Sequence, residues 1–207
     1  MHNLDTERRE RRPYQLKSRA LSQAQTRAKI VEATAQLHAT VGPARTQVSE
    51  IARRAGVQRR TVYDHFPDDA ALIQACSHLW LSRNPLPDPA HWQGIKTPVD
   101  RVSAALRAVY DFYSQDEKTL ALVLRDSSGI AALSAVLDDG LLRFLAGVRD
   151  DLVAALLGPK QARVRTAALV GIALDFWTWR RLTSVDGFSN SEAARLMACV
   201  TQDGGCS

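Results

Sequence analysis

The chain has 207 residues, of which 45% are hydrophobic and 24% are charged, and its formal net charge is +5. This composition is typical of a folded globular protein and excludes a disordered or fibrous one. The first residues, MHNLDTERRERR, are charged and do not resemble a secretory signal, and the most apolar stretch, residues 167–177, is too short to cross a membrane. We therefore expect a cytoplasmic protein without a membrane partner.

The charge is unevenly distributed along the chain. Residues 1–66 hold 13 Lys and Arg against 6 Asp and Glu, whereas residues 67–207 hold 14 against 16. A basic N-terminal third on a slightly acidic remainder is typical of a nucleic-acid-binding module joined to a domain with another role. Arginine-rich helices with a simple solvated face would give the same composition, so both interpretations stay open at this point.

The first elements form a compact series of short helices. Residues 1–25 are polar and basic without an apolar period, which predicts a flexible arm; the arm could follow DNA or act only as a solubilising tail. From Thr26, apolar residues recur at spacings of three and four until Gly42-Pro43, which predicts the first helix. Thr46 is expected to cap a second helix that ends at Gly56. A short third helix covers residues 58–65, and a fourth begins at Pro67.

The rest of the chain is also predicted to be helical. Residues 83–98 contain four prolines and are expected to form a loop between two domains. Helices are then expected over residues 98–113, 117–125, 131–156, 160–183 and 190–201, the last with Ser189 and Glu192 as a capping box. No stretch alternates with the period of a strand. The sequence therefore predicts an all-α fold with an arm (1–25), a first domain (26–82) and a second domain (83–207).

The second and third helices have the spacing of a helix-turn-helix. Gly56 permits the tight turn, and Ile51, Val57 and Val62 are expected to hold the two helices together. The third helix then leaves Gln58, Arg59, Arg60, Thr61, Tyr63 and Asp64 exposed. Arg can donate two hydrogen bonds to guanine and Gln can pair with adenine, whereas hydroxyl and imidazole groups suit phosphates. These residue types in this pattern indicate a DNA-reading helix.

Four ordered motifs, TRAKIVEATAQLHATVG, TQVSEIARRAGV, TVYDHF and DDAAL, resemble the DNA-binding domain of TetR-family transcriptional regulators over residues 26–80. Three positions depart from the family pattern: His38 replaces Phe, Arg60 replaces a small residue or Pro, and Asp69 replaces a Lys that can hold a phosphate. The residues predicted to contact DNA are Arg45, Thr46, Gln47, Gln58, Arg59, Arg60, Thr61, Tyr63 and His65. Tyr63 and His65 could instead pack or cap within the domain.

The resemblance also implies what the second domain does. TetR-family proteins are homodimers that join through their last two long helices and bind an effector inside the domain. Leu196, on the capped last helix, is expected to lie in the dimer interface. The residues predicted to line the ligand site are Tyr110, Tyr113, Arg125, Asp175, Phe176, Trp177 and Trp179, although for any single aromatic a place in the ordinary core is the better interpretation. The implied function is a homodimeric repressor that binds a palindromic operator on double-stranded DNA and is released by a small-molecule effector.

Two other classes of function are weighed against this one. A sequence-indifferent architectural protein could bind DNA through the basic arm. An all-α enzyme would need paired carboxylates or a metal set, but Asp138-Asp139 and Asp150-Asp151 are adjacent on helices and point about 100° apart. Cys76, Cys199 and Cys206 lack metal-site spacing, so we expect three reduced thiols, no metal and no cofactor. The prediction is therefore a DNA-binding regulator and not an enzyme.

Overall fold

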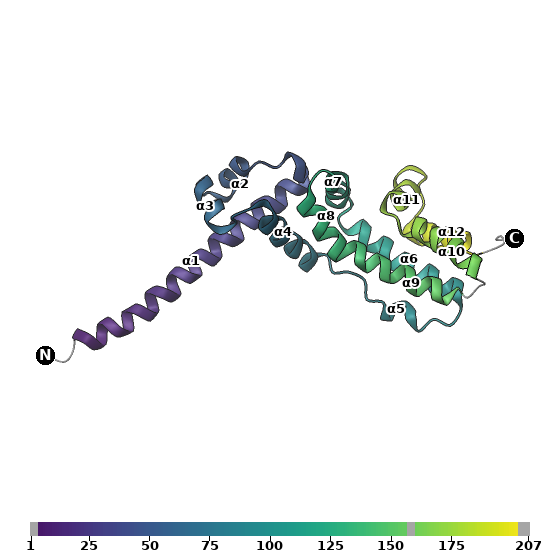
Figure 1. The fold of residues 1–207 in the computed structure, drawn as a ribbon, viewed down its shortest axis with the longest axis horizontal. Coiled ribbons are helices and arrows are strands. Elements are labelled where there is room, and N and C mark those ends of the chain that lie inside the picture. Colours follow the sequence, from purple (N-terminus) through teal and green to yellow (C-terminus); the bar gives the residue numbers. More distant parts are fainter. Residues whose placement is uncertain (1–3, 157–159, 203–207) are drawn as a thin grey trace. The chain divides into compact units, whose positions relative to one another are not determined.

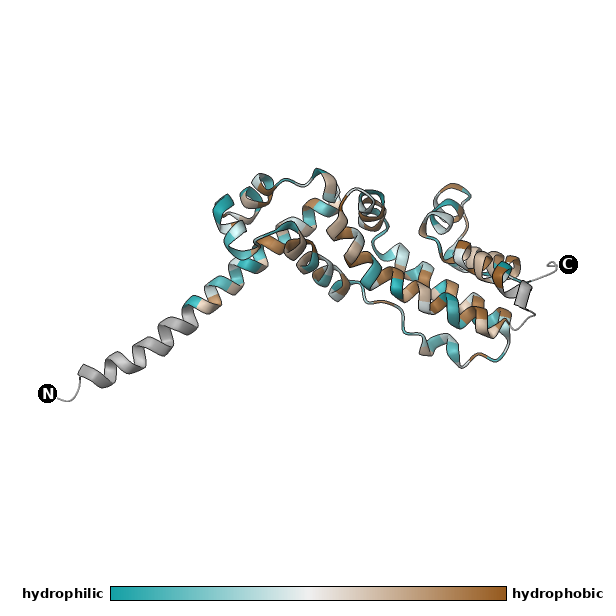
Figure 2. Ribbon diagram, in the orientation of Figure 1, coloured by the Kyte–Doolittle hydropathy of each residue, from teal (hydrophilic) through white to brown (hydrophobic). Residues whose placement is uncertain are grey.

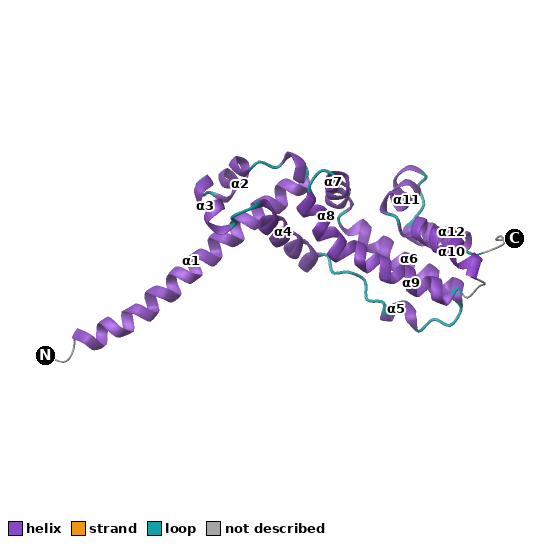
Figure 3. Cartoon of the chain, viewed as in Figure 1, coloured by secondary structure: helices purple, strands orange, loops and turns teal. Residues whose placement is uncertain are grey.

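Helices make up most of the described chain, as Figure 3 shows. The computed structural model describes residues 4–156 and 160–202, and within them there is no strand. The predicted all-α fold is confirmed. The helices form two compact units: unit 1 comprises Met1–Trp80 with Leu122–Leu133, and unit 2 comprises Leu81–Ala121 with Ser134–Ser207.

Unit 1 contains the N-terminal helices and a short stretch from much later in the sequence (Figure 1). Its elements are α1 (Leu4–Thr40), the 3₁₀ turn η1 (Pro43–Arg45), α2 (Val48–Ala55), α3 (Arg59–His65), α4 (Asp69–Arg83) as far as Trp80, the end of α7 (Glu117–Ser127) and the start of α8 (Ala131–Leu137). Ile30, Ala33 and Leu37 of α1 are buried at the helical spacing that the sequence indicated. They form one core with Ile51, Val62, Phe66, Leu72 and Cys76.

Two local predictions for unit 1 are wrong. α1 does not begin at Thr26 but continues back to Leu4, so the stretch expected to be a flexible arm is helical. Once the buried turns from Ile30 to Leu37 nucleate the helix, adding further polar residues costs little, because propagation is much easier than nucleation. Thr46 does not cap α2: Gln47 is the N-cap residue, and the Thr46 hydroxyl donates to the Gly42 carbonyl oxygen at 2.9 Å.

Unit 2 is a bundle built around α6 (Pro98–Gln115). The other elements are the end of α4, α5 (Ala90–Gln93), the start of α7, the end of α8, the π-helical turn η2 (Asp138–Leu142), α9 (Arg143–Ala155), α10 (Lys160–Leu174), α11 (Phe176–Arg180), the π-helical turn η3 (Arg181–Val185) and α12 (Asn190–Val200). α6 packs most extensively on α12, where Ala193, Ala194 and Ala198 are fully buried. These small side chains let the two helix backbones approach closely. The predicted capping box of Ser189 and Glu192 at the start of α12 is confirmed.

The prediction of one continuous helix over residues 160–183 is wrong, because the helix breaks at Asp175 between α10 and α11. Asp175 has an extended backbone, and its carboxylate accepts a hydrogen bond from the Thr178 backbone N–H at 2.8 Å, so it is the N-cap of α11. The break frees carbonyl groups at the end of α10, and a buried free carbonyl is costly. The buried hydroxyls of Tyr110 and Tyr113 donate to the carbonyl oxygens of Ala173 and Leu174, at 2.7 and 2.6 Å.

The proline-rich segment between α4 and α6 is more ordered than a plain loop. It contains the short helix α5, whose Trp92 is fully buried and donates its indole N–H to the Asp151 carboxylate at 3.3 Å. The expectation of three reduced thiols is also wrong, because Cys199 is disulfide-bonded. Cys76 is a free, buried thiol, and Cys206 lies outside the described residues. Among the helices described, none is long and apolar enough to span a bilayer.

Candidate nucleic-acid interface

The turn between α2 and α3 depends on one glycine. Gly56 has φ 69° and ψ 35°, the left-handed backbone conformation that residues with a β-carbon adopt only with strain. The backbone N–H of Val57 donates to the Ala52 carbonyl oxygen at 3.0 Å and closes the end of α2. Ile51 and Val62 are buried against each other's helices in the core of unit 1. The predicted helix-turn-helix geometry is therefore present.

The outer face of α3 carries the side chains suited to reading DNA. Gln58, Arg59 and Arg60 are exposed at its N-terminal end, and Tyr63 follows with 47% of its surface exposed. Thr61 and His65 are half-buried at the sides of the helix. Among the residues that the structure describes, no carboxylate pairs with Arg59 or Arg60. Their guanidinium groups are thus available to an external acceptor.

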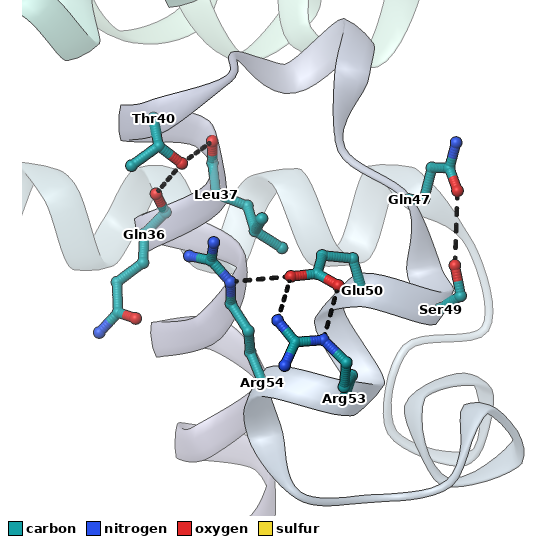
Figure 4. Close-up of polar contacts among 8 residues, drawn as sticks. All are labelled: Gln36, Leu37, Thr40, Gln47, Ser49, Glu50, Arg53 and Arg54. Atoms are coloured by element: carbon teal, nitrogen blue, oxygen red, sulfur yellow. Dashed lines mark hydrogen bonds and ion pairs between the residues drawn. The ribbon is translucent and has the colours of Figure 1, made fainter.

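The arginines of α2 are in a different situation, as the close-up in Figure 4 shows. Arg53 donates to both carboxylate oxygens of Glu50, at 2.8 and 2.7 Å, and Arg54 donates to one of them at 3.1 Å. These hydrogen bonds, that of Arg53 first, lower the Glu50 pKa to about 2. Glu50 therefore offsets the charge of α2, and the unpaired positive charge of the motif lies on α3.

The turn that precedes α2 carries the remaining predicted DNA contacts. Arg45 and Gln47 are exposed, and Thr46 is half-buried. The backbone N–H groups of Glu50 and Ile51 both bond to the Gln47 carbonyl oxygen at 3.0 Å, so the first turn of α2 is well formed. All nine predicted residues therefore lie on α3, at its N-cap or on the segment that leads into α2. That they contact DNA stays a prediction.

Known proteins share the sequence of this motif. Residues 30–76 match the sequence profile of bacterial regulatory proteins of the tetR family. The helix-turn-helix of this chain is therefore similar to that of TetR-family regulators. It is 45% identical over 51 residues to the HTH-type transcriptional regulator TtgR of Pseudomonas putida, a match that covers 25% of this chain and only 24% of that relative.

Solved structures extend the likeness to the second unit, at the level of the TetR fold. A tetR-family transcriptional regulator from Streptomyces coelicolor is similar with a TM-score of 0.55 and 15% identity, covering 84% of this chain and 80% of that one. A TetR transcription regulator from Haloarcula marismortui ATCC 43049 has a TM-score of 0.54 and 17% identity, covering 87% and 97%. Identity this low supports the fold and no finer property.

The residues predicted to line a ligand site differ in their surroundings. Tyr110, Tyr113, Phe176 and Trp179 are buried in unit 2, where the Tyr113 ring lies 5.4 Å from that of Phe176 and 5.5 Å from that of Trp179. Trp177 is 44% exposed, Asp175 is an exposed N-cap, and Arg125 belongs to unit 1. The buried aromatics contact one another as core residues do, and their part in ligand binding stays a prediction.

A hollow of about 460 Å³ lies elsewhere in unit 2, between α5 and α9. Its wall is mainly apolar, with one guanidinium and one carboxylate, and consists of Pro89, Trp92, Gln93, Gly140, Arg143, Phe144, Gly147, Val148 and Asp151. Gly140 and Gly147 leave space along the face of the helix. The hollow could not be predicted from the sequence because the two elements that enclose it, Ala90–Gln93 and Arg143–Ala155, are far apart in the chain.

His38 gives unit 1 a dependence on pH. Burial lowers its pKa to about 4, although the nearby Asp126 carboxylate opposes that effect. The unfolded chain takes up a proton on His38 below the ordinary value of 6.5, whereas the folded chain does so only near pH 4. We expect the free energy of unfolding to fall as the pH drops from 6.5 towards 4. In His38→Gln, which cannot titrate, this part of the slope should be absent in urea unfolding curves; an unchanged slope would contradict the assignment.

Proposed function

We propose that this protein is a DNA-binding transcriptional regulator that works in the cytoplasm and binds a palindromic operator as a homodimer. The observation that carries the proposal is the outer face of α3, where Arg59 and Arg60 are exposed without a described carboxylate partner and Gln58 lies beside them. A guanidinium can donate two hydrogen bonds to guanine in the major groove, and a carboxamide can pair with adenine. Such a face on a rigid helix-turn-helix suits sequence-specific binding.

Exposed apolar side chains on the last helices support the homodimer. Val164 and Ile172 on α10 are 74% and 52% exposed, and Leu196 and Val200 on α12 are 40% and 46% exposed. Figure 2 shows hydrophobic residues along both of these helices, which contact each other. An exposed apolar face of this kind marks an interaction surface. A second copy of the chain is the occupant we propose, because a twofold dimer gives the two DNA-reading helices that a palindrome requires.

A small-molecule effector is the third part of the proposal. The hollow between α5 and α9 has a volume within the range of small-ligand sites, mainly apolar walls, and the charged groups of Arg143 and Asp151. A small molecule that binds the free dimer more tightly than the DNA-bound dimer lowers operator affinity. The decrease equals the ratio of its affinities for the two states. We propose repression that such an effector relieves.

Footprinting on the DNA that flanks the gene for this chain tests the proposal. We expect protection of one palindrome, with half-sites about one helical turn apart. As salt is raised, affinity should fall on every duplex, but the palindrome should stay preferred by about a thousandfold or more. Equal affinity for all duplexes at every salt concentration would instead identify an architectural DNA-binding protein.

A further inference from the structure

The turn between α1 and α2 is unusually constrained. Gly42 follows α1 with φ 89° and ψ 159°, a backbone conformation that favours glycine, and Pro43 begins η1 directly after it. Both residues are buried. The backbone N–H of Arg45 and the Thr46 hydroxyl donate to the Gly42 carbonyl oxygen, at 3.3 and 2.9 Å. This turn sets where the chain enters α2, and it carries Arg45, Thr46 and Gln47.

One polar group of the turn takes its partner from a distant part of the sequence. The backbone N–H of Ala44 lies in the first turn of η1, where no carbonyl of the short helix can accept it. It donates to the Asp126 carboxylate at 3.0 Å, across 82 residues of sequence. Asp126 is only 8% exposed, although it is charged. A buried carboxylate is costly unless it is paired, so its position here indicates a defined role.

Arg125 completes the arrangement from the same end of α7. Its Nε donates to the other oxygen of Asp126 at 2.7 Å. This hydrogen bond, with the Ala44 N–H and the charges of Arg125 and Arg45, keeps the Asp126 pKa below its ordinary value despite burial. The carboxylate is therefore ionised at neutral pH, and both of its oxygens are engaged.

Gly42 fits closely beneath this carboxylate. A β-carbon at Gly42 would lie 2.5 Å from the nearer Asp126 oxygen and 2.7 Å from an Arg125 nitrogen. Any side chain at Gly42 would therefore displace Asp126 in addition to straining the backbone. The turn and the end of α7 are thus shaped to each other.

We propose that Asp126 is a positioning residue for operator binding: its carboxylate holds the α1–α2 turn and so sets the start of α2 within unit 1. The DNA-binding unit is then made of two separate stretches of sequence, and the second, Leu122–Leu133, contributes to operator binding through Asp126. The inference rests on the proposed function, since a positioning role for binding requires that the chain binds an operator. Asp126 itself touches no DNA in this scheme.

Full-length variants test the role, with Asp150→Ala as the matched control. Asp150 also follows an arginine that donates to it, at 3.0 Å from Arg149, but it is exposed and lies in unit 2. Both substitutions to Ala remove one negative charge, which by itself strengthens binding to any DNA. For Asp126→Ala we expect an operator affinity about tenfold lower, because the Ala44 N–H loses the acceptor that fixes the turn. Asp126→Asn retains an acceptor oxygen and should keep most of the affinity, and Asp150→Ala should lose none.

Amide hydrogen exchange separates this inference from the proposed function. We expect exchange at Ala44 to become about tenfold faster in Asp126→Ala and to stay unchanged in Asp150→Ala. Gly42→Ala should cost less operator affinity in the Asp126→Ala background than in the natural chain, because the displaced group is gone. Unchanged Ala44 exchange together with unchanged operator affinity overturns the proposal. If the natural chain prefers no palindrome, the proposed function fails, and the exchange result alone decides whether Asp126 holds the turn.

Discussion

Arg60→Ala is expected to weaken operator binding by about 1 to 3 kcal/mol, roughly 5- to 150-fold, and to relax base preference at one position in each half-site. The reason is the exposure of Arg60 near the start of α3, where no described carboxylate competes for its guanidinium. Losing a paired set of donors to one base should affect the operator far more than random DNA. Electrophoretic or fluorescence titrations on the operator, on single-base variants and on an unrelated duplex measure both effects.

Two further variants separate base reading from simple charge. Arg60→Lys keeps the positive charge but loses the bidentate donor geometry of the guanidinium. Compared with Arg60→Ala, it should bind all DNA more tightly without showing more base preference. Arg107→Ala removes the same charge from an exposed position in unit 2, where the side chain is 60% exposed, and should barely change operator preference. An equal loss on operator and random DNA in Arg60→Ala would mean that Arg60 contacts a phosphate.

The helix-turn-helix could be predicted from sequence because its signals are local. Gly56 lies at the position that needs a left-handed backbone, and the buried residues Ile51 and Val62 recur at helical spacing around it. The same holds for the capping box of Ser189 and Glu192, which depends on residues three apart. The helix-turn-helix and the capping box were therefore predicted at the right residues, whereas the predicted Thr46 cap of α2 was one residue early.

The break at Asp175 could not be predicted in the same way. No Gly or Pro marks it, and its sequence, ALDFW, continues an apolar helical pattern. What stabilises the break is distant in the sequence: the hydroxyls of Tyr110 and Tyr113 bind the carbonyl groups that it frees. From the sequence, these tyrosines were interpreted as candidate residues of the ligand site. Their hydrogen bonds to the backbone explain why they are buried without a ligand.

Asp126 illustrates the same limit at the candidate site. Ala44 binds Asp126 through its backbone N–H, a group that every residue except proline carries. The sequence therefore gives no sign of this contact. From the sequence, Arg125 and Asp126 were both interpreted as possible polar anchors for a ligand in the second domain. The fold brings the end of α7 into unit 1 instead. A hydrogen bond between a carboxylate and a backbone N–H 82 residues away is visible only in the folded chain.

Leu196→Asp is expected to convert the protein to a monomer and to abolish selective operator binding. Leu196 is 40% exposed on α12, one helical turn before the exposed Val200. In the proposed dimer this face is covered, so a carboxylate there would be buried without a partner in both copies. Such a charge costs several kcal/mol, so the dimer dissociation constant should rise by about a hundredfold or more. Sedimentation or light scattering measures the mass, and operator titration measures the consequence for binding.

Leu142→Asp is the matched control for this test. Leu142 is 42% exposed, so the same substitution changes a similar amount of exposed apolar surface, but it lies in η2 and not on α10 or α12. We expect Leu142→Asp to remain dimeric and to bind the operator. Circular dichroism should show both variants folded, because neither leucine belongs to a core. If Leu196→Asp remained a dimer, the interface would have to lie elsewhere, and the exposed apolar residues of α12 would need another partner.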